Sequence, residues 1–356
     1  MGQVLAMRLG VNLGYWDAAS DAGEGIALAM EADRLGYAVA WAAEAYGSDA
    51  ATVLATVAAR TERLDIGSAV FQIPARTPAM TAMTAATLDA LSGGRFRLGL
   101  GVSGPQVSEG WHGVRFDRPL ARTREYVDIV RTALARERVA YSGDFFTLPL
   151  PDGPGKALTL TVHPVRERIP LYLAAIGPRN LELAGEIADG WLAIFFAPEH
   201  APASLAHLDA GLARSGRTRA DFDIVPTVPV VMGADVAACA APLQAYTALY
   251  VGGMGSKETN FYNQLACRMG YEEQAQAIQA AYLARDYRAA AAAVPLGLVD
   301  STCLIGPRDR IRERLRAYAD AGVTTLTIAP YGPTLEARIE ILRTMAELLA
   351  ESGLAG

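Results

Sequence analysis

Cysteine and histidine are scarce in this chain. Its 356 residues include three cysteines, Cys239, Cys267 and Cys303, which are widely spaced and form no CxxC pair or Cys/His cluster. A scattered, odd-numbered set gives no basis for a disulfide framework and fits a reducing compartment. The four histidines include no pair at helical spacing and complete no Ser-His-Asp order. We therefore predict no metal site, and the metalloenzyme and triad-hydrolase classes lose support.

Clusters of basic residues and long apolar runs are also missing. Lysine and arginine total 32 against 38 acidic residues, the net charge is -6, and the basic residues are scattered. A nucleic-acid surface needs clustered cations, so no nucleic-acid partner is expected. No apolar stretch is long enough to span a bilayer, and the N-terminus lacks a signal-peptide pattern. We therefore expect no membrane partner and a cytoplasmic location.

The chain is instead rich in short apolar segments that alternate with helix-period segments. Hydrophobic residues make up 51% and charged residues 20%, which is typical of a globular protein with a large core. The predicted strands number eight, and they are 8–14, 37–43, 64–70, 96–101, 171–175, 190–195, 223–232 and 323–329. The repeated order of strand and helix favours a closed or doubly wound parallel sheet over an α+β arrangement. Eight such units predict an α/β fold, a (β/α)8 TIM barrel.

Two stretches interrupt this alternation. Residues 141–168 are rich in Gly, Pro and alternating Thr and Leu, which predicts an irregular excursion with short β pairing before strand five. Residues 235–293 are Ala-rich and longer than one crossover needs, which predicts a helical insertion near the barrel mouth that shapes substrate access. Because barrels of this length often fold as one unit, we expect residues 1–356 to form a single domain.

Two loops at the expected carboxyl ends of strands could bind an anion. After strand four, glycines allow close backbone approach, while Ser103, the amide of Gly104 and Gln106 offer donors. After strand five, residues 175–179 (Ala175, Ile176, Gly177, Pro178 and Arg179) lead directly into a helix, which places free N–H groups and a positive charge together. The alternatives are a tight turn for the first loop and an ordinary strand-to-helix connection for the second.

Polar side chains from three other strand ends are expected at the same rim. Glu44 follows an apolar strand, where it could bind a ring or transfer a proton, or it could simply cap a loop. Asn12 at the end of strand one and Gln72 after strand three could contact a cofactor. Each of these two, taken alone, is more often a backbone anchor.

Residues 109–113 combine an acid, an aromatic ring and an imidazole between glycines. His112 could act as a general acid or base near neutral pH, although a single histidine is more often a hydrogen-bonded structural residue. Lys257, in the predicted insertion, could bind an acidic ligand tail or could be a solvated surface lysine.

Taken together, these segments resemble the bacterial-luciferase-like superfamily, and within it the branch of oxidoreductases that depend on the deazaflavin coenzyme F420. The resemblance runs from Arg8 to about Leu349. Its most specific segments are 42–47, 67–70, 86–95, 98–101, 103–106, 109–113, 174–178 and 184–191.

The resemblance implies that the coenzyme ring lies in the barrel mouth and that its phosphate is held by the loops around Ser103-Gly104 and Gly177-Pro178. It also implies a non-proline cis peptide, placed here at Ala69-Val70, behind the ring. Several relatives have a histidine after the acidic residue that follows strand two, whereas Ala45 follows Glu44 here. Proton transfer then falls to Glu44, His112, Glu109, Tyr46 or the substrate.

The function implied is hydride transfer between coenzyme F420 and a small organic substrate, which is an alcohol or carbonyl, an activated C=C or a pterin-type C=N. Glu44 or His112 would assist a proton. The alternatives are an FMN-dependent luciferase-like monooxygenase and a non-catalytic deazaflavin-binding protein. Relatives are commonly homodimers, so the resemblance implies a homodimer here.

Overall fold

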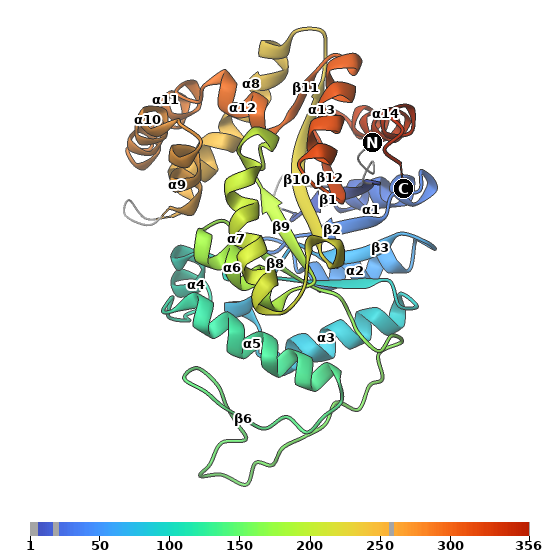
Figure 1. The fold of residues 1–356 in the computed structure, drawn as a ribbon, viewed down its shortest axis with the longest axis vertical. Helices are drawn as coiled ribbons and strands as arrows, with labels where there is room; N and C mark the ends of the chain where they lie inside the picture. The colour runs from blue at the N-terminus through green and yellow to red at the C-terminus, as the bar shows by residue number, and fades with distance from the viewer. Residues whose placement is uncertain (1–5, 17–20, 256–259, 356) are drawn as a thin grey trace.

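The computed structural model describes residues 6–16, 21–255 and 260–355. Within them, eight parallel strands close into a barrel that helices surround (Figure 1). In order around the barrel these strands are β1 (Arg8–Gly14), β2 (Val39–Ala42), β3 (Asp65–Ser68), β5 (Phe96–Gly101), β8 (Leu171–Ala174), β9 (Gly190–Ile194), β10 (Asp223–Met232) and β12 (Thr325–Pro330). The last strand pairs with the first, which closes the ring. The predicted (β/α)8 TIM barrel is confirmed.

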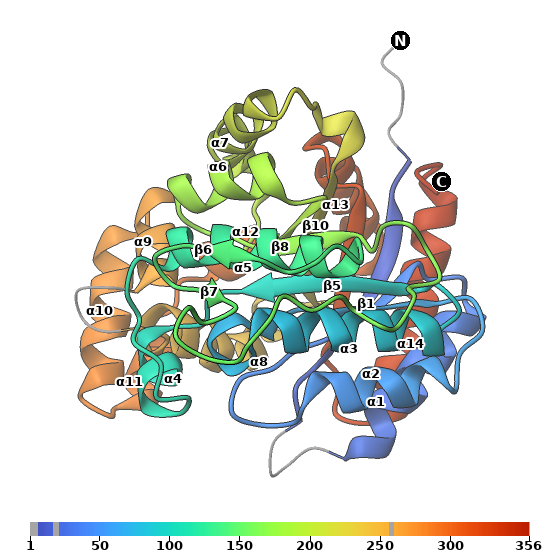
Figure 2. The same cartoon turned by 90° about the horizontal axis from the view of Figure 1, so that it is seen from below.

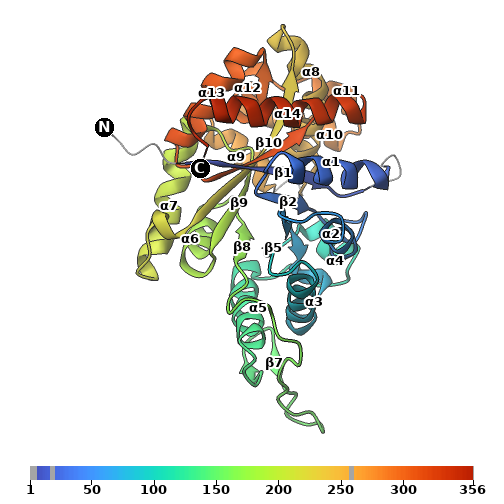
Figure 3. The ribbon, with the colours of Figure 1, turned by 90° about the vertical axis from the view of Figure 1, so that its right-hand side faces the viewer.

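Helices follow the strands and cover the outside of the barrel (Figure 3). They are α1 (Ala22–Arg34), α2 (Ala50–Ala58), α3 (Pro78–Leu91), α4 (Pro105–Gly110), α5 (Pro119–Leu134), α6 (Pro178–Ile187), α7 (Ala201–Arg214), α13 (Arg308–Asp320) and α14 (Leu335–Glu351), with short 3₁₀ turns at η1 (Ile73–Ala75), η2 (Pro198–His200) and η3 (Arg219–Asp221). In the described ranges, we find no helix that combines the length and apolar character needed to cross a bilayer.

Two short strands were not predicted. β4 (Phe71–Gln72) pairs with β5, and β11 (Leu304–Gly306) pairs with β10 outside the ring. Segments of two or three residues are too short to show an alternating pattern. The strand expected at 64–70 ends at Ser68, and the peptide bond between Ala69 and Val70 is cis, as the resemblance implied.

The two interruptions expected from the sequence are both present. Before β8, a short hairpin of β6 (Tyr141–Ser142) and β7 (Thr147–Leu148) belongs to an irregular segment that extends away from the body beside α3 and α5 (Figures 1 and 3). After β10 come α8 (Val236–Ala248), a π-helical turn η4 (Leu249–Gly253), α9 (Phe261–Arg268), α10 (Glu272–Leu283), α11 (Tyr287–Ala292) and α12 (Leu296–Thr302). Figure 2 shows α9 to α11 on the side toward which the arrow of β5 points, so this part of the insertion lies at the carboxyl ends of the strands.

Large side chains fill the barrel interior. Trp41, Tyr172, Leu192 and Val225 form one buried cluster, and Trp41 packs edge-on against Tyr172 with ring centroids 5.2 Å apart. Glycines make room for them. A Cβ at Gly67 would lie 2.3 Å from the ring of Trp41, closer than real Cβ contacts. The interior is therefore a packed core, as in other barrels of this type.

Charged groups close the amino-terminal end of the barrel. Arg97, near the start of β5, forms ion pairs with Asp65 at 2.7 Å and with Asp223 at 3.2 Å, both at the first residues of their strands. The guanidinium also donates to the hydroxyl of Tyr172 at 3.1 Å. This end is therefore occupied by structural ion pairs, and the opposite end is left for ligands.

Candidate active site

Glu44 is held by a cation and two backbone amides at the carboxyl end of β2. Its side chain is 7% exposed, and one carboxylate oxygen accepts from Nη2 of Arg76 at 2.5 Å. Its carboxylate also accepts from the backbone N–H of Ala50 at 3.2 Å and of Gln72 at 3.4 Å. Arg76 makes a second ion pair, with Asp49, at 2.6 Å. The Glu44 carboxylate therefore joins the loops that follow β2 and β4.

Gln72 connects the same region to the loop after β5. Its side-chain amide donates to the carbonyl oxygen of Ala45 at 2.8 Å and accepts from the hydroxyl of Ser103 at 2.9 Å. Gln72 is 4% exposed, and Ser103 has a left-handed backbone with φ +62°. Three predicted residues, Glu44, Gln72 and Ser103, are thus brought together from three separate strand ends.

The cis peptide Ala69-Val70 lies between β3 and β4, next to this network. A Cβ at Gly101, on the neighbouring strand, would meet a methyl group of Val70 at 2.4 Å, so only glycine leaves space for Val70 there. Ser68 exchanges hydrogen bonds with the backbone of Gly99 at 2.8 and 2.9 Å. Sequence reasoning missed Ser68, because a small polar residue in a buried strand carries no distinctive pattern.

The second predicted anion loop follows β8, the strand beside β5. Gly177 precedes the first turn of α6, and no side chain caps the helix there. Trp191 donates its indole N–H to the carbonyl of Ala175 at 2.9 Å, and Arg268 from α9 reaches the carbonyl of Ile176 at 3.2 Å. The first backbone N–H groups of α6 therefore have no side-chain cap among the described residues.

The first predicted anion loop lies on the neighbouring strand. Gly104 is the residue before α4, and the side chain of Gln106 lies beside it, 3.5 Å from where a Cβ on Gly104 would be. The loops at 103–106 and 175–179 therefore leave the barrel from adjacent strands at the same end.

His112 follows the short helix α4, and its ring is partly buried. Its backbone N–H donates to the carbonyl of Val107 at 3.1 Å, whereas its Nε2 is buried without a hydrogen-bond partner among the described residues. Glu109 accepts from the backbone N–H of Phe116 at 3.0 Å. Among the described residues the two side chains therefore share no hydrogen bond, and the imidazole has a buried nitrogen without a partner.

Asn12 and Lys257 are two further residues predicted to contact a ligand. The Asn12 side chain accepts from the backbone N–H of Gly14 at 3.1 Å, which is the local anchoring contact that was one of the two expectations. Lys257 lies outside the described residues.

Tyrosines of the insertion form a group that sequence reasoning did not identify. Phe195 at the end of β9 contacts Tyr246, Tyr250 and Tyr262, with ring centroids 5.6, 5.5 and 6.1 Å away. Tyr331, directly after β12, lies 6.2 Å from Tyr246. The spacing of Tyr246 and Tyr250, one helical turn apart, was the available signal. We call these five residues the aromatic wall.

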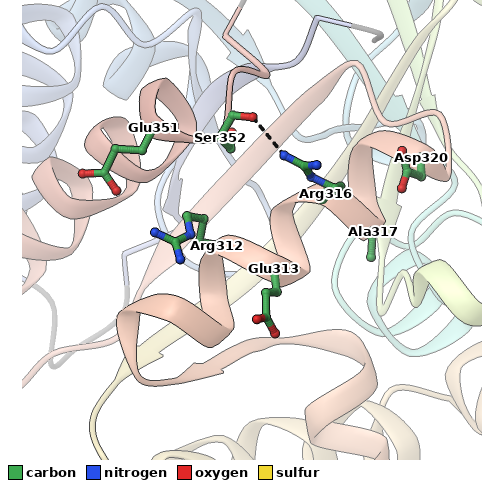
Figure 4. A pocket seen from close by; sticks show the side chains of 7 residues that line it. All are labelled: Arg312, Glu313, Arg316, Ala317, Asp320, Glu351 and Ser352. Atoms are coloured by element: carbon green, nitrogen blue, oxygen red, sulfur yellow. Dashed lines mark hydrogen bonds between the residues drawn. The ribbon is translucent and has the colours of Figure 1, made fainter. Parts of the chain in front are cut away.

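A surface hollow of about 570 Å³ lies elsewhere, between α13 and the end of α14. Figure 4 shows charged side chains around it, including Arg312 and Arg316, the latter bonded to the carbonyl of Ser352. None of the predicted site residues lines it. It belongs to the outer helical layer, away from the strand ends.

Comparison with known protein families identifies the family to which this chain belongs. Residues 5–325 match the family model described as "Luciferase-like monooxygenase". The chain belongs to this luciferase-like family. The resemblance inferred from the sequence motifs is confirmed at this level, and because the family is one of enzymes, so is the expectation of an enzyme.

Relatives of the luciferase-like chain carry names that refer to coenzyme F420 or to a pterin. A Mycobacterium tuberculosis protein named "Putative coenzyme F420-dependent oxidoreductase" is 46% identical over 90% of this chain and 94% of its own length. The 5,10-methylenetetrahydromethanopterin reductase of Archaeoglobus fulgidus is 28% identical over 87% of this chain and 91% of its own.

A solved structure gives the same fold for the luciferase-like chain. The coenzyme F420 dependent tetrahydromethanopterin reductase from Methanopyrus kandleri superposes with a TM-score of 0.81 at 23% identity, covering 96% of this chain and 98% of that one. At this level of identity the match supports the barrel architecture alone.

Proposed function

We propose that this luciferase-like enzyme transfers a hydride between coenzyme F420 and a small organic substrate, which is an alcohol or carbonyl, an activated C=C or a pterin-type C=N. The observation that carries the proposal is the 46% identity, over nine-tenths of the chain, to a protein named for F420 dependence. The mouth geometry agrees, because polar groups from several strand ends converge there around a closed barrel.

The residues at the mouth fit such a coenzyme. Ser103, Gly104 and Gln106, together with the uncapped turn that begins at Gly177-Pro178 and carries Arg179, offer the donors that a phosphate needs. Ala175 and Ile176 complete this loop. A bound deazaflavin supplies two-electron hydride chemistry.

The ring side of the proposed site lies at the first three strand ends. Ala69 and Val70 would lie behind the ring, with Gln72 and Asn12 beside it. The Glu44 carboxylate would fix the loops on which these residues lie, because Arg76 and two backbone amides already occupy its oxygens.

Of the two candidates for proton transfer, the contacts favour His112. Its Nε2 is buried and unpartnered among the described residues, so it is the group with a free site for a substrate proton. Glu44 would have to give up its Arg76 partner first. We therefore assign proton transfer to His112 and positioning to Glu44.

We also propose that residues 1–356 fold as one domain and act as a homodimer in the cytoplasm. Cys239, Cys267 and Cys303 are all free thiols, in keeping with a reducing compartment. Met80 and Met83 on α3 are 48% and 51% exposed. Exposed apolar side chains of this size are suited to a contact between subunits. Sedimentation equilibrium would show a single species of twice the chain mass, and a monomer would contradict the dimer.

The function is tested by presenting the purified chain with coenzyme F420 and with FMN. We expect F420 to be retained on dialysis, and its absorbance to bleach or recover with at least one member of a panel of alcohols, carbonyls, enones and pterins. Tight retention of FMN with oxygen consumption would instead identify a monooxygenase. Retention of F420 with no change in its absorbance across the panel would identify a binding protein, and either result would contradict the proposal.

A further inference from the structure

The aromatic wall crosses the mouth from the insertion to the strand ends. Within it, Tyr246 and Tyr250 have ring centroids 4.8 Å apart, and Tyr250 and Tyr262 have centroids 4.9 Å apart. Tyr15 after β1 and Tyr46 after β2 lie near enough to Tyr250 to raise the pKa of its hydroxyl. The wall therefore lies over the ends of strands far apart around the ring.

The tyrosines of the wall are surrounded by protein but not sealed from solvent. Tyr246, Tyr250, Tyr262 and Tyr331 are each half-buried. Burial nevertheless raises the pKa of Tyr250 to about 12 and raises the pKa of the other three hydroxyls above the usual range. Side chains that are desolvated and still accessible are suited to contact a small molecule.

The wall is electrically neutral as far as the described residues show. The groups that influence the four hydroxyls are other tyrosines and the thiol of Cys303, and no described carboxylate, lysine or arginine is among them. Because their pKa values are raised, these tyrosines remain protonated at physiological pH. A carboxylate or phosphate placed against these hydroxyls would find no cation among those described groups to offset its desolvation.

Tyr250 lies at the centre of the wall, with ring contacts to Phe195, Tyr246 and Tyr262. A protonated tyrosine hydroxyl can donate as well as accept, so Tyr250 can offer a neutral donor to an oxygen of a bound molecule.

We propose that the aromatic wall binds the substrate, and that the substrate is a neutral, planar aromatic molecule whose oxygen accepts a hydrogen bond from Tyr250. This inference rests on the proposed function and names the substrate class for the same site. Ring contacts select an aromatic body, because paired aromatic rings stabilise each other beyond the burial of their apolar area. The neutral donor selects a carbonyl-type oxygen over a carboxylate.

Direct binding to the full chain, without coenzyme, tests the inference by isothermal titration calorimetry. The probes are acetophenone, cyclohexyl methyl ketone, which is neutral but not aromatic, and benzoate, which is aromatic but charged. We expect acetophenone to bind at least several-fold more tightly than either of the other two. Equal or tighter binding of benzoate or of the cyclohexyl ketone would overturn the substrate class.

Substitutions in the aromatic wall then test whether acetophenone binds there. Tyr250→Phe should weaken acetophenone about five-fold, the loss of one neutral hydrogen bond. Tyr287→Phe, at an exposed ring outside the wall, is the matched control and should leave affinity unchanged. Phe195→Leu removes a ring without removing a hydroxyl and should also weaken acetophenone binding. This second variant still tests the binding site if Tyr250→Phe fails to fold. Unchanged affinity in the folded variants would overturn the site.

Retention of F420, measured separately, distinguishes this inference from the proposed function. Retention and bleaching of F420 together with no acetophenone binding would overturn the aromatic substrate class and leave the function standing. Acetophenone binding that depends on Tyr250, in a chain that does not retain F420, would support the wall and contradict the function.

Discussion

At the scale of the residue, the strand-end position of Glu44 was predictable but its partner was not. The rule that functional groups follow barrel strands placed Glu44 and Gln72 at the mouth. The cation that neutralises Glu44 is Arg76, 32 residues further along, and nothing in the local sequence connects them. Long-range pairing of this kind depends on the closed barrel, so it is visible only in three dimensions.

The Glu44–Arg76 pair predicts a loss of stability in Glu44→Gln. Both side chains are nearly buried, so removing the Glu44 charge leaves Arg76 with only the more exposed carboxylate of Asp49 and should lower the free energy of unfolding by about 3 kcal/mol. Asp49→Asn is the control, because Asp49 is 48% exposed, and it should cost less than about 1 kcal/mol. Urea denaturation measures both. Equal losses in the two variants would contradict a special role for Glu44.

Substitution of His112 is expected to lower turnover and to leave the free energy of unfolding nearly unchanged. Because its Nε2 makes no hydrogen bond to a described residue, His112→Gln should change the free energy of unfolding by no more than about 0.5 kcal/mol. The same variant should lower turnover with F420 by roughly 10²- to 10⁴-fold and remove one limb of its pH profile. Glu109→Gln, whose carboxylate has a backbone partner, is the control. An unchanged pH profile in His112→Gln would contradict its role.

At the scale of the element, sequence signals worked best where local chemistry fixes a boundary. Pro78 begins α3, the Thr77 side chain accepts from the backbone N–H of Met80, and Gly93 and Gly94 with positive φ follow its end. β4 and β11 were missed because they are too short to carry a period. The tyrosines of α8 and α9 were missed because an Ala-rich helical stretch does not show which face reaches the mouth.

The packing of β2 against β3 predicts the effect of Gly67→Ala. The added Cβ would overlap the ring of Trp41, so we expect a loss of roughly 1–3 kcal/mol or more in the free energy of unfolding. Gly110→Ala is the matched control, since no atom lies within 4 Å of its Cβ position. Thermal and urea unfolding would measure the difference. A Gly67→Ala variant as stable as Gly110→Ala would show that the interior is not packed as described.

At the scale of the whole molecule, the two ends of the chain close the barrel. β1 pairs with β12, and α1 packs beside α14. Glu31 of α1 forms ion pairs with Arg34 at 2.6 Å and with Arg343 of α14 at 2.7 Å. The count of eight strands let the sequence predict this closure. The Glu31–Arg343 ion pair that accompanies it joins residues 312 positions apart and was not predictable.

Glu31 predicts a pH dependence of stability. The hydrogen bond from Arg34, and then that from Arg343, lower its pKa from 4.5 to about 2. A lowered pKa in the folded state means that the contribution is complete above pH 4.5 and is lost as pH falls toward 2. The free energy of unfolding of the parent chain should exceed that of Glu31→Gln by less than about 1 kcal/mol, as is usual for such a pair, and this difference should shrink across this window. An advantage that stays constant or grows on acidification would contradict the assignment.

The central claim is that coenzyme F420 binds in the mouth of this barrel, and a crystal structure of the complex tests it most directly. The account predicts the ring against Ala69 and Val70, with the phosphate between Ser103-Gly104 and Gly177-Pro178. Coenzyme density in the hollow between α13 and α14, or at any place away from the strand ends, would contradict it.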